Sequence, residues 1–255
     1  MPAARSPRIR HHRHRCALPS GIILVALASF AVSVHAATVS IPCARHNTLY
    51  QESGALSNGS GPTILAGRYL QWQTLNAYEL RRALVYFPVS SAVPAGAIIT
   101  GVDLQLYCSR PAAGPGTPTS LYRVGSNWGS ASSDAGDPGD LGASAQTGDA
   151  TWVNNFYPYS TWPGDYVLHF STGIPATPLG PVHIGMGGMP GLMGQDVQAW
   201  LDNPAANFGW VLLGDESTMT ETVNVFTAHP VLVVSYVMPT PVKASTWGRV
   251  KTHYR

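Results

Sequence analysis

Charged side chains are scarce in this sequence. Asp, Glu, Lys and Arg make up only 11% of its 255 residues, and no lysine precedes Lys243. Residues 37–238 carry six arginines and all 13 acidic residues, so this body has a formal charge of 6 − 13 = −7, although the whole chain is +2. The net negative charge of residues 37–238 argues against a surface that binds nucleic acid or anionic membranes, because both are themselves negatively charged.

Short catalytic motifs are missing as well. The sequence contains no His-Glu-x-x-His, Cys-x-x-Cys, Gly-x-Ser-x-Gly or phosphate-loop pattern. The histidines after residue 36 are scattered and show no metal-ligand spacing. We therefore expect no enzymatic activity. One alternative stays open, a glycosidase-type pair of carboxylates, because two carboxylates that come together from distant strands form no short motif in the sequence.

Only one long apolar run occurs, and it lies near the start of the chain. Five arginines precede the run 21–32, and Val34-His35-Ala36 follows it. This order of features is typical of a secretory signal peptide, and the run is shorter than the about 20 residues of a membrane span. We expect a signal peptide at 1–36 and an extracellular or cell-surface protein without a membrane span. An uncleaved anchor is the alternative.

Cysteine is also rare, with three residues in the whole chain. Cys16 belongs to the expected signal peptide, which leaves Cys43 and Cys108 in the exported body. An even pair of cysteines in an oxidising compartment predicts a disulfide between them. Two free, buried thiols are the alternative.

Turn-forming residues, in contrast, are abundant: Gly 26 and Pro 21, with 45% hydrophobic residues, indicate a folded sheet protein with long loops. Residues 97–108 alternate in polarity, which is the pattern of a half-buried antiparallel strand. Asp196 can cap a short helix over 196–201. We expect one all-β domain at 37–238, a two-sheet antiparallel sandwich of jelly-roll type with one short helix, and with further strands near 81–88, 121–124, 166–170, 182–185, 208–213, 222–226 and 230–236.

The C-terminal segment 239–255 differs from the body. Two prolines open it, and basic and aromatic residues follow, namely Lys243, Trp247, Arg249, Lys251, Tyr254 and Arg255. It resembles the short basic and aromatic endings of some secreted bacterial proteins, which implies a sorting or surface-attachment segment. A solvated chain end is the alternative.

Several short motifs occur in a recognisable order along the body. They are Arg82-Ala83-Leu84-Val85-Tyr86-Phe87, Leu104-Gln105-Leu106-Tyr107, Asp149-Ala150-Thr151-Trp152, Asp196-Val197-Gln198-Ala199-Trp200-Leu201, Asn207-Phe208-Gly209-Trp210-Val211-Leu212 and Pro230-Val231-Leu232-Val233-Val234-Ser235-Tyr236. From about residue 46 to 236 this order resembles the DNRLRE-type secreted domains, which are related to disaggregatase-related repeats and alginate-binding carbohydrate-binding modules. The resemblance implies a β-jelly-roll without catalysis. The acidic start of the family is reduced here to Asn47-Thr48-Leu49-Tyr50-Gln51-Glu52.

Aromatic residues are the candidates for carbohydrate binding. They cluster in a region that is otherwise polar and rich in Gly and Pro, and the candidates are Trp162, Tyr159, Trp128 and Tyr157. Flat rings stack on the apolar C–H faces of sugars while polar neighbours bond the hydroxyls. The alternative is that such rings pin a long loop to the sheet, which we favour for Trp152.

A loop rich in aspartate and glycine is the metal candidate. Asp134, Asp137 and Asp140 lie close together in sequence and can supply the oxygen ligands that calcium prefers. A solvated, turn-rich loop without metal is the alternative.

These features together predict a secreted, non-catalytic β module that binds extracellular polysaccharide or forms part of the cell-surface matrix. A structural or adhesive surface protein tethered through the tail is the second hypothesis. A polysaccharide lyase or hydrolase is the third, and the missing motifs count against it.

Overall fold

The computed structural model describes residues 36–71, 77–113, 116–185 and 191–239. The expected signal peptide and the basic tail therefore lie outside the described residues, apart from Ala36 and Pro239. Within the described ranges, neither helix has the length and hydropathy that crossing a membrane requires.

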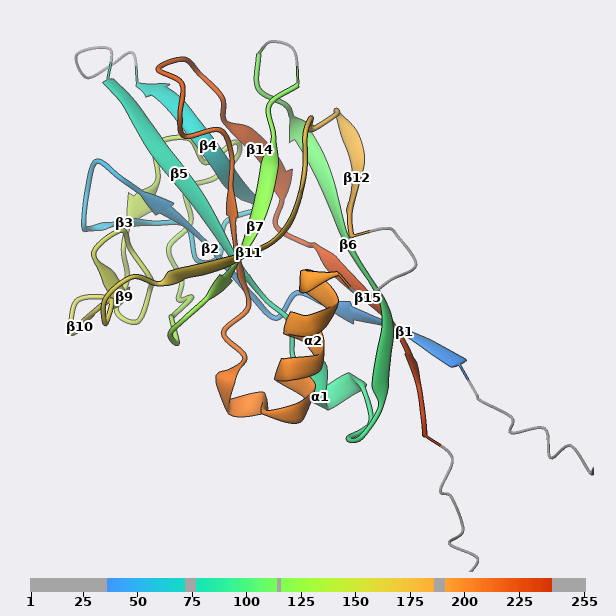
Figure 1. Cartoon of the computed structure of the whole chain (residues 1–255). Helices are drawn as coiled ribbons and strands as arrows, with labels where there is room; N and C mark the ends of the chain where they lie inside the picture. Colours follow the sequence, from blue (N-terminus) through green and yellow to red (C-terminus); the bar gives the residue numbers. More distant parts are fainter. Residues whose placement is uncertain (1–35, 72–76, 114–115, 186–190, 240–255) are drawn as a thin grey trace, which may run out of the picture. The chain divides into compact units, whose positions relative to one another are not determined.

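Most of the described chain forms one antiparallel sheet with the strand order β1-β15-β6-β14-β4-β5-β13-β7-β11, to which β12 adds on β6 and β2 on β5 (Figure 1). The mostly β, antiparallel character is confirmed, but the sheet is large and curled rather than a clear two-sheet sandwich. Its strands are β1 (Ala36–Pro42), β2 (Arg45–Tyr50), β4 (Thr63–Gln71), β5 (Ala77–Tyr86), β6 (Ile98–Arg110), β7 (Thr119–Val124), β11 (Val167–Ile174), β12 (Gly180–Ile184), β13 (Trp210–Leu213), β14 (Asn224–Thr227) and β15 (Val231–Val237).

The sheet is continuous because strand β4 serves both of its halves. Residues 63–66 pair with β14, and residues 67–71 pair with β5. We call the half with β1, β15, β6, β14 and β12 the first wing, and the half with β5, β2, β13, β7 and β11 the second wing. Gly67 lies at the change of partner with a φ of +123°, and a Cβ there would lie 2.4 Å from the carbonyl oxygen of Thr222. Only glycine fits this bend without strain.

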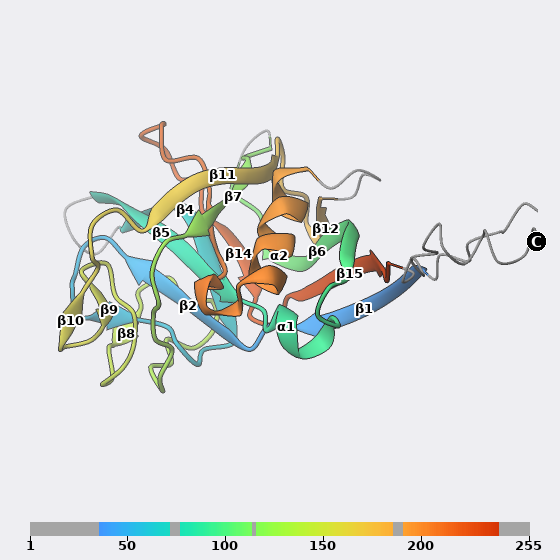
Figure 2. The same cartoon turned by 60° about the horizontal axis from the view of Figure 1, so that its bottom comes forward.

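The main core lies between the two wings. On β6 the alternation predicted from sequence is confirmed, because Val102, Leu104 and Leu106 all belong to this buried cluster. Helix α2 (Leu192–Asp202) contacts both β6 of the first wing and β11 of the second (Figure 2). Its Trp200 is fully buried and packs on Trp210 of β13, with ring centroids 4.5 Å apart. The helix thus fills the space between the wings with apolar side chains.

The helices differ from the prediction in two ways. Helix α2 begins at Leu192, so Asp196 lies inside the helix and does not cap it. A second short helix, α1 (Val89–Ala92), follows β5, and a 3₁₀ turn, η1 (Pro204–Ala206), follows α2. The start of α2 falls after a glycine-rich segment with few of the polar capping residues that mark a helix in sequence.

A second core covers the outer face of the second wing. The segment 125–166, which we call the insert, contains β8 (Ala143–Ser144), β9 (Asn154–Phe156) and β10 (Ser160–Thr161), and β8 pairs with β3 (Leu56–Ser57). Insert residues such as Trp128 and Tyr166 pack on Leu84 and Val211 of the sheet. Strands β2 and β13 of the second wing are therefore buried on both faces along most of their length.

The predicted disulfide is not formed. Cys43 and Cys108 are both free. Cys43 follows β1 and Cys108 lies on β6, and β15 runs between these strands. Two strand spacings amount to about 9.6 Å, which exceeds the about 7 Å that a disulfide can bridge between Cα atoms. Burial raises the pKa of each thiol to about 11, so both stay protonated at neutral pH.

Treatment with dithiothreitol is therefore expected to leave the thermal unfolding midpoint of the purified protein unchanged. A disulfide closing this loop would contribute roughly 4 kcal/mol, and its reduction would lower the midpoint by several degrees. Scanning calorimetry with and without the reductant distinguishes the two results. A drop of several degrees would contradict the arrangement of the two thiols.

Candidate functional site

Trp162 is held rigidly at the edge of the insert. Its ring stacks on Tyr166, with centroids 4.2 Å apart and an interplanar angle of 26°. Its indole N–H donates to the carbonyl oxygen of Thr151 at 2.9 Å. The side chain is half-buried, so it shows only part of its surface to solvent. The indole is thus fixed in position before any ligand arrives.

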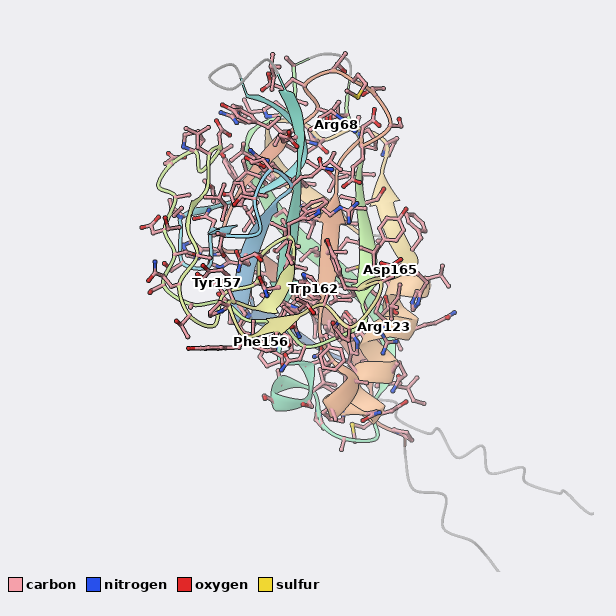
Figure 3. The ribbon with its side chains drawn as sticks, turned by 90° about the vertical axis from the view of Figure 1, so that its left-hand side faces the viewer. Arg68, Arg123, Phe156, Tyr157, Trp162 and Asp165 are labelled. Carbon is pink, nitrogen blue, oxygen red and sulfur yellow. The ribbon has the colours of Figure 1, made fainter. Side chains whose placement is uncertain are left out.

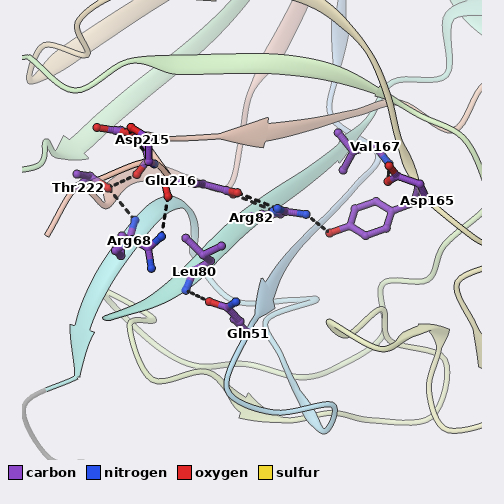
Figure 4. A network of polar contacts seen from close by, with 11 residues as sticks. Gln51, Arg68, Leu80, Arg82, Asp165, Val167, Asp215, Glu216 and Thr222 are labelled. Atoms are coloured by element: carbon purple, nitrogen blue, oxygen red, sulfur yellow. Dashed lines mark hydrogen bonds and ion pairs between the residues drawn. The ribbon is translucent and has the colours of Figure 1, made fainter. Parts of the chain in front are cut away.

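Arg82 connects Tyr166, one ring of this pair, to Glu216 (Figure 4). The guanidinium of Arg82 donates to both carboxylate oxygens of Glu216, at 2.8 and 2.7 Å, and to the hydroxyl of Tyr166 at 3.2 Å. It also lies over the ring of Trp152, 4.8 Å from the centroid. Burial by itself lowers the pKa of Arg82, but the hydrogen bonds and charge interactions with Glu216 and Tyr166 together outweigh it and raise the pKa above its ordinary value. Trp152 therefore pins the insert to the sheet, as expected for this residue.

Tyr159 and Tyr157 lie on either side of Pro158, between β9 and β10. Tyr159 is 83% exposed, the most exposed of the large hydrophobic side chains described. Tyr157 is half-buried, and its backbone N–H and carbonyl bond to Asp149 and Gly148 of the neighbouring segment at 2.7 Å. Figure 3 shows Phe156, Tyr157 and Trp162 on the side of the second wing that the insert covers. The structure thus brings three of the four aromatic candidates to one part of the insert.

Trp128 is the exception among these candidates. It is completely buried, and its indole N–H donates to the carbonyl oxygen of Phe208 at 2.7 Å. Its ring belongs to the core beneath the insert, so it cannot offer a face to a sugar in this conformation. The sequence pattern alone does not separate an anchoring indole from an exposed one, because both occur in polar, glycine-rich loops.

The aspartates of the metal candidate do not converge. Asp140 is ion-paired with Arg110 through both carboxylate oxygens, and Asp134 accepts the backbone N–H of Gly136 at 2.8 Å. Asp137 is exposed on the same loop. Within the described ranges, no three His, Cys, Asp or Glu side chains are arranged to hold a metal ion. The loop is therefore not a preformed calcium cage.

Asn47 ties the insert to strand β2. Its buried carboxamide makes five hydrogen bonds, with partners Thr48, Ser57, Asn58, Gly129 and Ala150 at 2.7 to 3.2 Å. Two of these partners belong to the insert. The side chain thus connects the sheet, the end of β3 and the insert.

A buried carboxylate that sequence reasoning missed belongs to helix α2. Asp196 is 1% exposed and accepts hydrogen bonds from Ser171 Oγ at 2.5 Å and from the indole N–H of Trp210 at 2.9 Å. His169 Nε2 lies 2.8 Å from its other oxygen, and Arg123 Nη1 lies 3.7 Å away. The four partners come from β7, β11 and β13. No spacing in the sequence signals this group, since its members are distant along the chain.

No protein-family model, curated protein or solved structure matches this chain. The candidate site is therefore defined by its geometry: a rigid Trp162, a half-buried Tyr157 and an exposed Tyr159 on one insert.

Proposed function

We propose that this protein is an exported, non-catalytic β module that binds polysaccharide through the aromatic residues of the insert. The exposure of Tyr159 carries the proposal. At 83% exposure its ring contributes nothing to the core, so its face is free to stack on the apolar C–H face of a sugar. Ser160, Thr161 and Asp165, all exposed nearby in sequence, offer polar groups for sugar hydroxyls.

The carboxylates around the insert support binding rather than hydrolysis. Both oxygens of Asp149 accept backbone N–H groups, from Ala131 at 2.5 Å and from Gln146 at 2.8 Å. Glu216 is engaged by Arg82 on both oxygens. Side chains used in this way hold the loops in place, whereas a glycosidase needs two carboxyl groups facing its substrate.

Tyr159→Ala and Trp162→Ala are each expected to weaken binding to the recognised polysaccharide about tenfold, because each removes a stacking face. Affinity electrophoresis of the purified protein in gels containing single polysaccharides measures the change. The matched control is Tyr107→Ala, which removes a half-exposed ring from β6 of the first wing. If the wild-type protein is retained by none of the polysaccharides, or if Tyr107→Ala weakens retention equally, the proposal fails.

A further inference from the structure

Polar side chains from three parts of the chain meet around Asn127 at the start of the insert. Arg45 of β2 donates from Nη1 to the carbonyl oxygen of Trp128 at 2.7 Å, and both of its terminal nitrogens lie 3.4 Å from Asn127 Oδ1. Asn155 of β9 donates from Nδ2 to the carbonyl oxygen of Asn127 at 3.0 Å. Ser126 precedes Asn127 in the chain. We call Arg45, Ser126, Asn127 and Asn155 the Asn127 group.

Three polar atoms of this group are buried and have no hydrogen-bond partner within the described residues. They are Arg45 Nε, Ser126 Oγ and Asn155 Oδ1. Asn155 is only 8% exposed as a whole. Buried polar atoms in native proteins are nearly always paired, because an unpaired one loses its bonds to water without replacement. Two of these atoms belong to Arg45 and Asn155, which contact Asn127, and the third belongs to Ser126, its neighbour in the chain. Together they point to a partner from outside the chain.

The types of the three atoms define the chemistry of that partner. Arg45 Nε is a donor, Asn155 Oδ1 is an acceptor, and Ser126 Oγ can act as either. A carboxylate or sulfate only accepts hydrogen bonds and would leave Asn155 unpaired, and an ammonium group only donates. A pair of hydroxyl groups can both donate and accept hydrogen bonds. The charge of Arg45 already lies between the rings of Tyr86 and Trp128, 4.4 and 4.9 Å from their centroids.

One member of the group, Asn127, lies at the surface. Its 3.4 Å contacts with Arg45 are long for hydrogen bonds, so a ligand hydroxyl can replace them. Phe156 follows Asn155 directly, and its ring lies so close to Gly129 that a Cβ there would be 2.9 Å from Phe156 Cδ1. An aromatic ring and hydrogen-bonding side chains are thus neighbours on β9, one residue from Tyr157.

We infer that the Asn127 group is a subsite that binds the hydroxyls of a neutral saccharide. The inference rests on the proposed function and specifies its substrate class. The formal charge of −7 on residues 37–238 agrees with a neutral ligand, since it repels polyanions at long range.

The test measures binding of the full-length purified protein to neutral glucans, mannans and xylans and to polygalacturonate. Ser126→Ala and Asn127→Ala are each expected to weaken binding to the neutral polysaccharide about three- to tenfold, the effect of one hydrogen bond. Ser126→Ala should leave the thermal midpoint unchanged or raise it, because it removes an unpaired hydroxyl. Thr100→Ala, which removes an exposed hydroxyl from β6 of the first wing, is the matched control and should bind like the wild type.

The outcomes separate this inference from the proposed function. If the wild type binds and Tyr159→Ala weakens it while Ser126→Ala and Asn127→Ala do not, the subsite is wrong and the proposed function stands. Binding to polygalacturonate alone overturns the neutral class. A lower thermal midpoint of Ser126→Ala with unchanged binding shows that the hydroxyl serves an internal water and overturns the subsite. No binding by the wild type to any probe overturns both proposals.

Discussion

Replacing Asn47 by Leu is expected to lower the free energy of unfolding by about 4 kcal/mol, a large effect for one substitution. The buried carboxamide makes five hydrogen bonds. A leucine of similar volume leaves their backbone and hydroxyl partners unpaired, at about 1–3 kcal/mol for each group that stays buried. Local relaxation and entry of water reduce the sum. Urea unfolding followed by tryptophan fluorescence measures the change.

The insert should unfold first in this variant, because it supplies two of the hydrogen-bond partners of Asn47, the carbonyl oxygens of Gly129 and Ala150. Limited proteolysis is expected to cut Asn47→Leu within residues 125–166 before the sheet is digested. Thr147→Ala, which removes an exposed side chain from the insert, is the control and should change the unfolding free energy by about 0.5 kcal/mol or less. A change below about 1 kcal/mol for Asn47→Leu would show that the insert is held by its aromatic contacts alone.

Replacing Asp196 by Ala is expected to lower the free energy of unfolding by about 3–5 kcal/mol. The variant leaves the guanidinium of Arg123, 19% exposed, without its carboxylate. It also removes the acceptor of the buried Trp210 N–H and of Ser171 Oγ. Because these donors belong to the second wing, the helix loses its polar attachment to that wing. Chemical denaturation of the variant and the wild type gives the difference.

Asp202→Ala serves as the control for this variant. Asp202 ends the same helix, is exposed, and accepts a hydrogen bond from Gln198 at 3.0 Å, so its loss should stay within about 0.5 kcal/mol. A second variant, Asp196→Asn, keeps the size of the side chain and one carbonyl acceptor. It is expected to recover only part of the stability, because an amide nitrogen cannot accept from Trp210 and Ser171 as the second carboxylate oxygen does. Equal stability of Asp196→Ala and the wild type would contradict the role of this carboxylate.

Strands with one buried face were readily predicted from the sequence. Residues 97–108 alternate, and β6 spans Ile98–Arg110; the apolar run at 230–236 corresponds to β15 at Val231–Val237. Strand β2 was missed, because the insert covers its outer face and buries the polar Asn47 and Thr48 beside Leu49 and Tyr50. A strand buried on both faces with polar residues has no period of two in its hydrophobicity.

The candidate site was likewise predictable from the sequence only in part. Composition places the aromatic residues together in one segment, but it does not distinguish the exposed Tyr159 from the buried Trp128. The Asn127 group joins residues 45, 126, 127 and 155, and no local pattern connects them. An even number of cysteines in an exported body predicts a disulfide between Cys43 and Cys108. The distance between them across β15 decides that this bond does not form.

The sequence by itself determined the antiparallel β character and most of the strands of the curled sheet. It also determined the small number of charged residues and the net negative charge of residues 37–238. These follow from local periodicity and composition, which each segment carries alone. Only the tertiary structure decided how the sheet curls, which rings face water and which carboxylates are buried. The bend at Gly67 depends on its contact with Thr222, and the burial of Asp196 depends on Arg123, Ser171 and Trp210. Such contacts join residues far apart in the chain, so their energies exist only once the fold has formed.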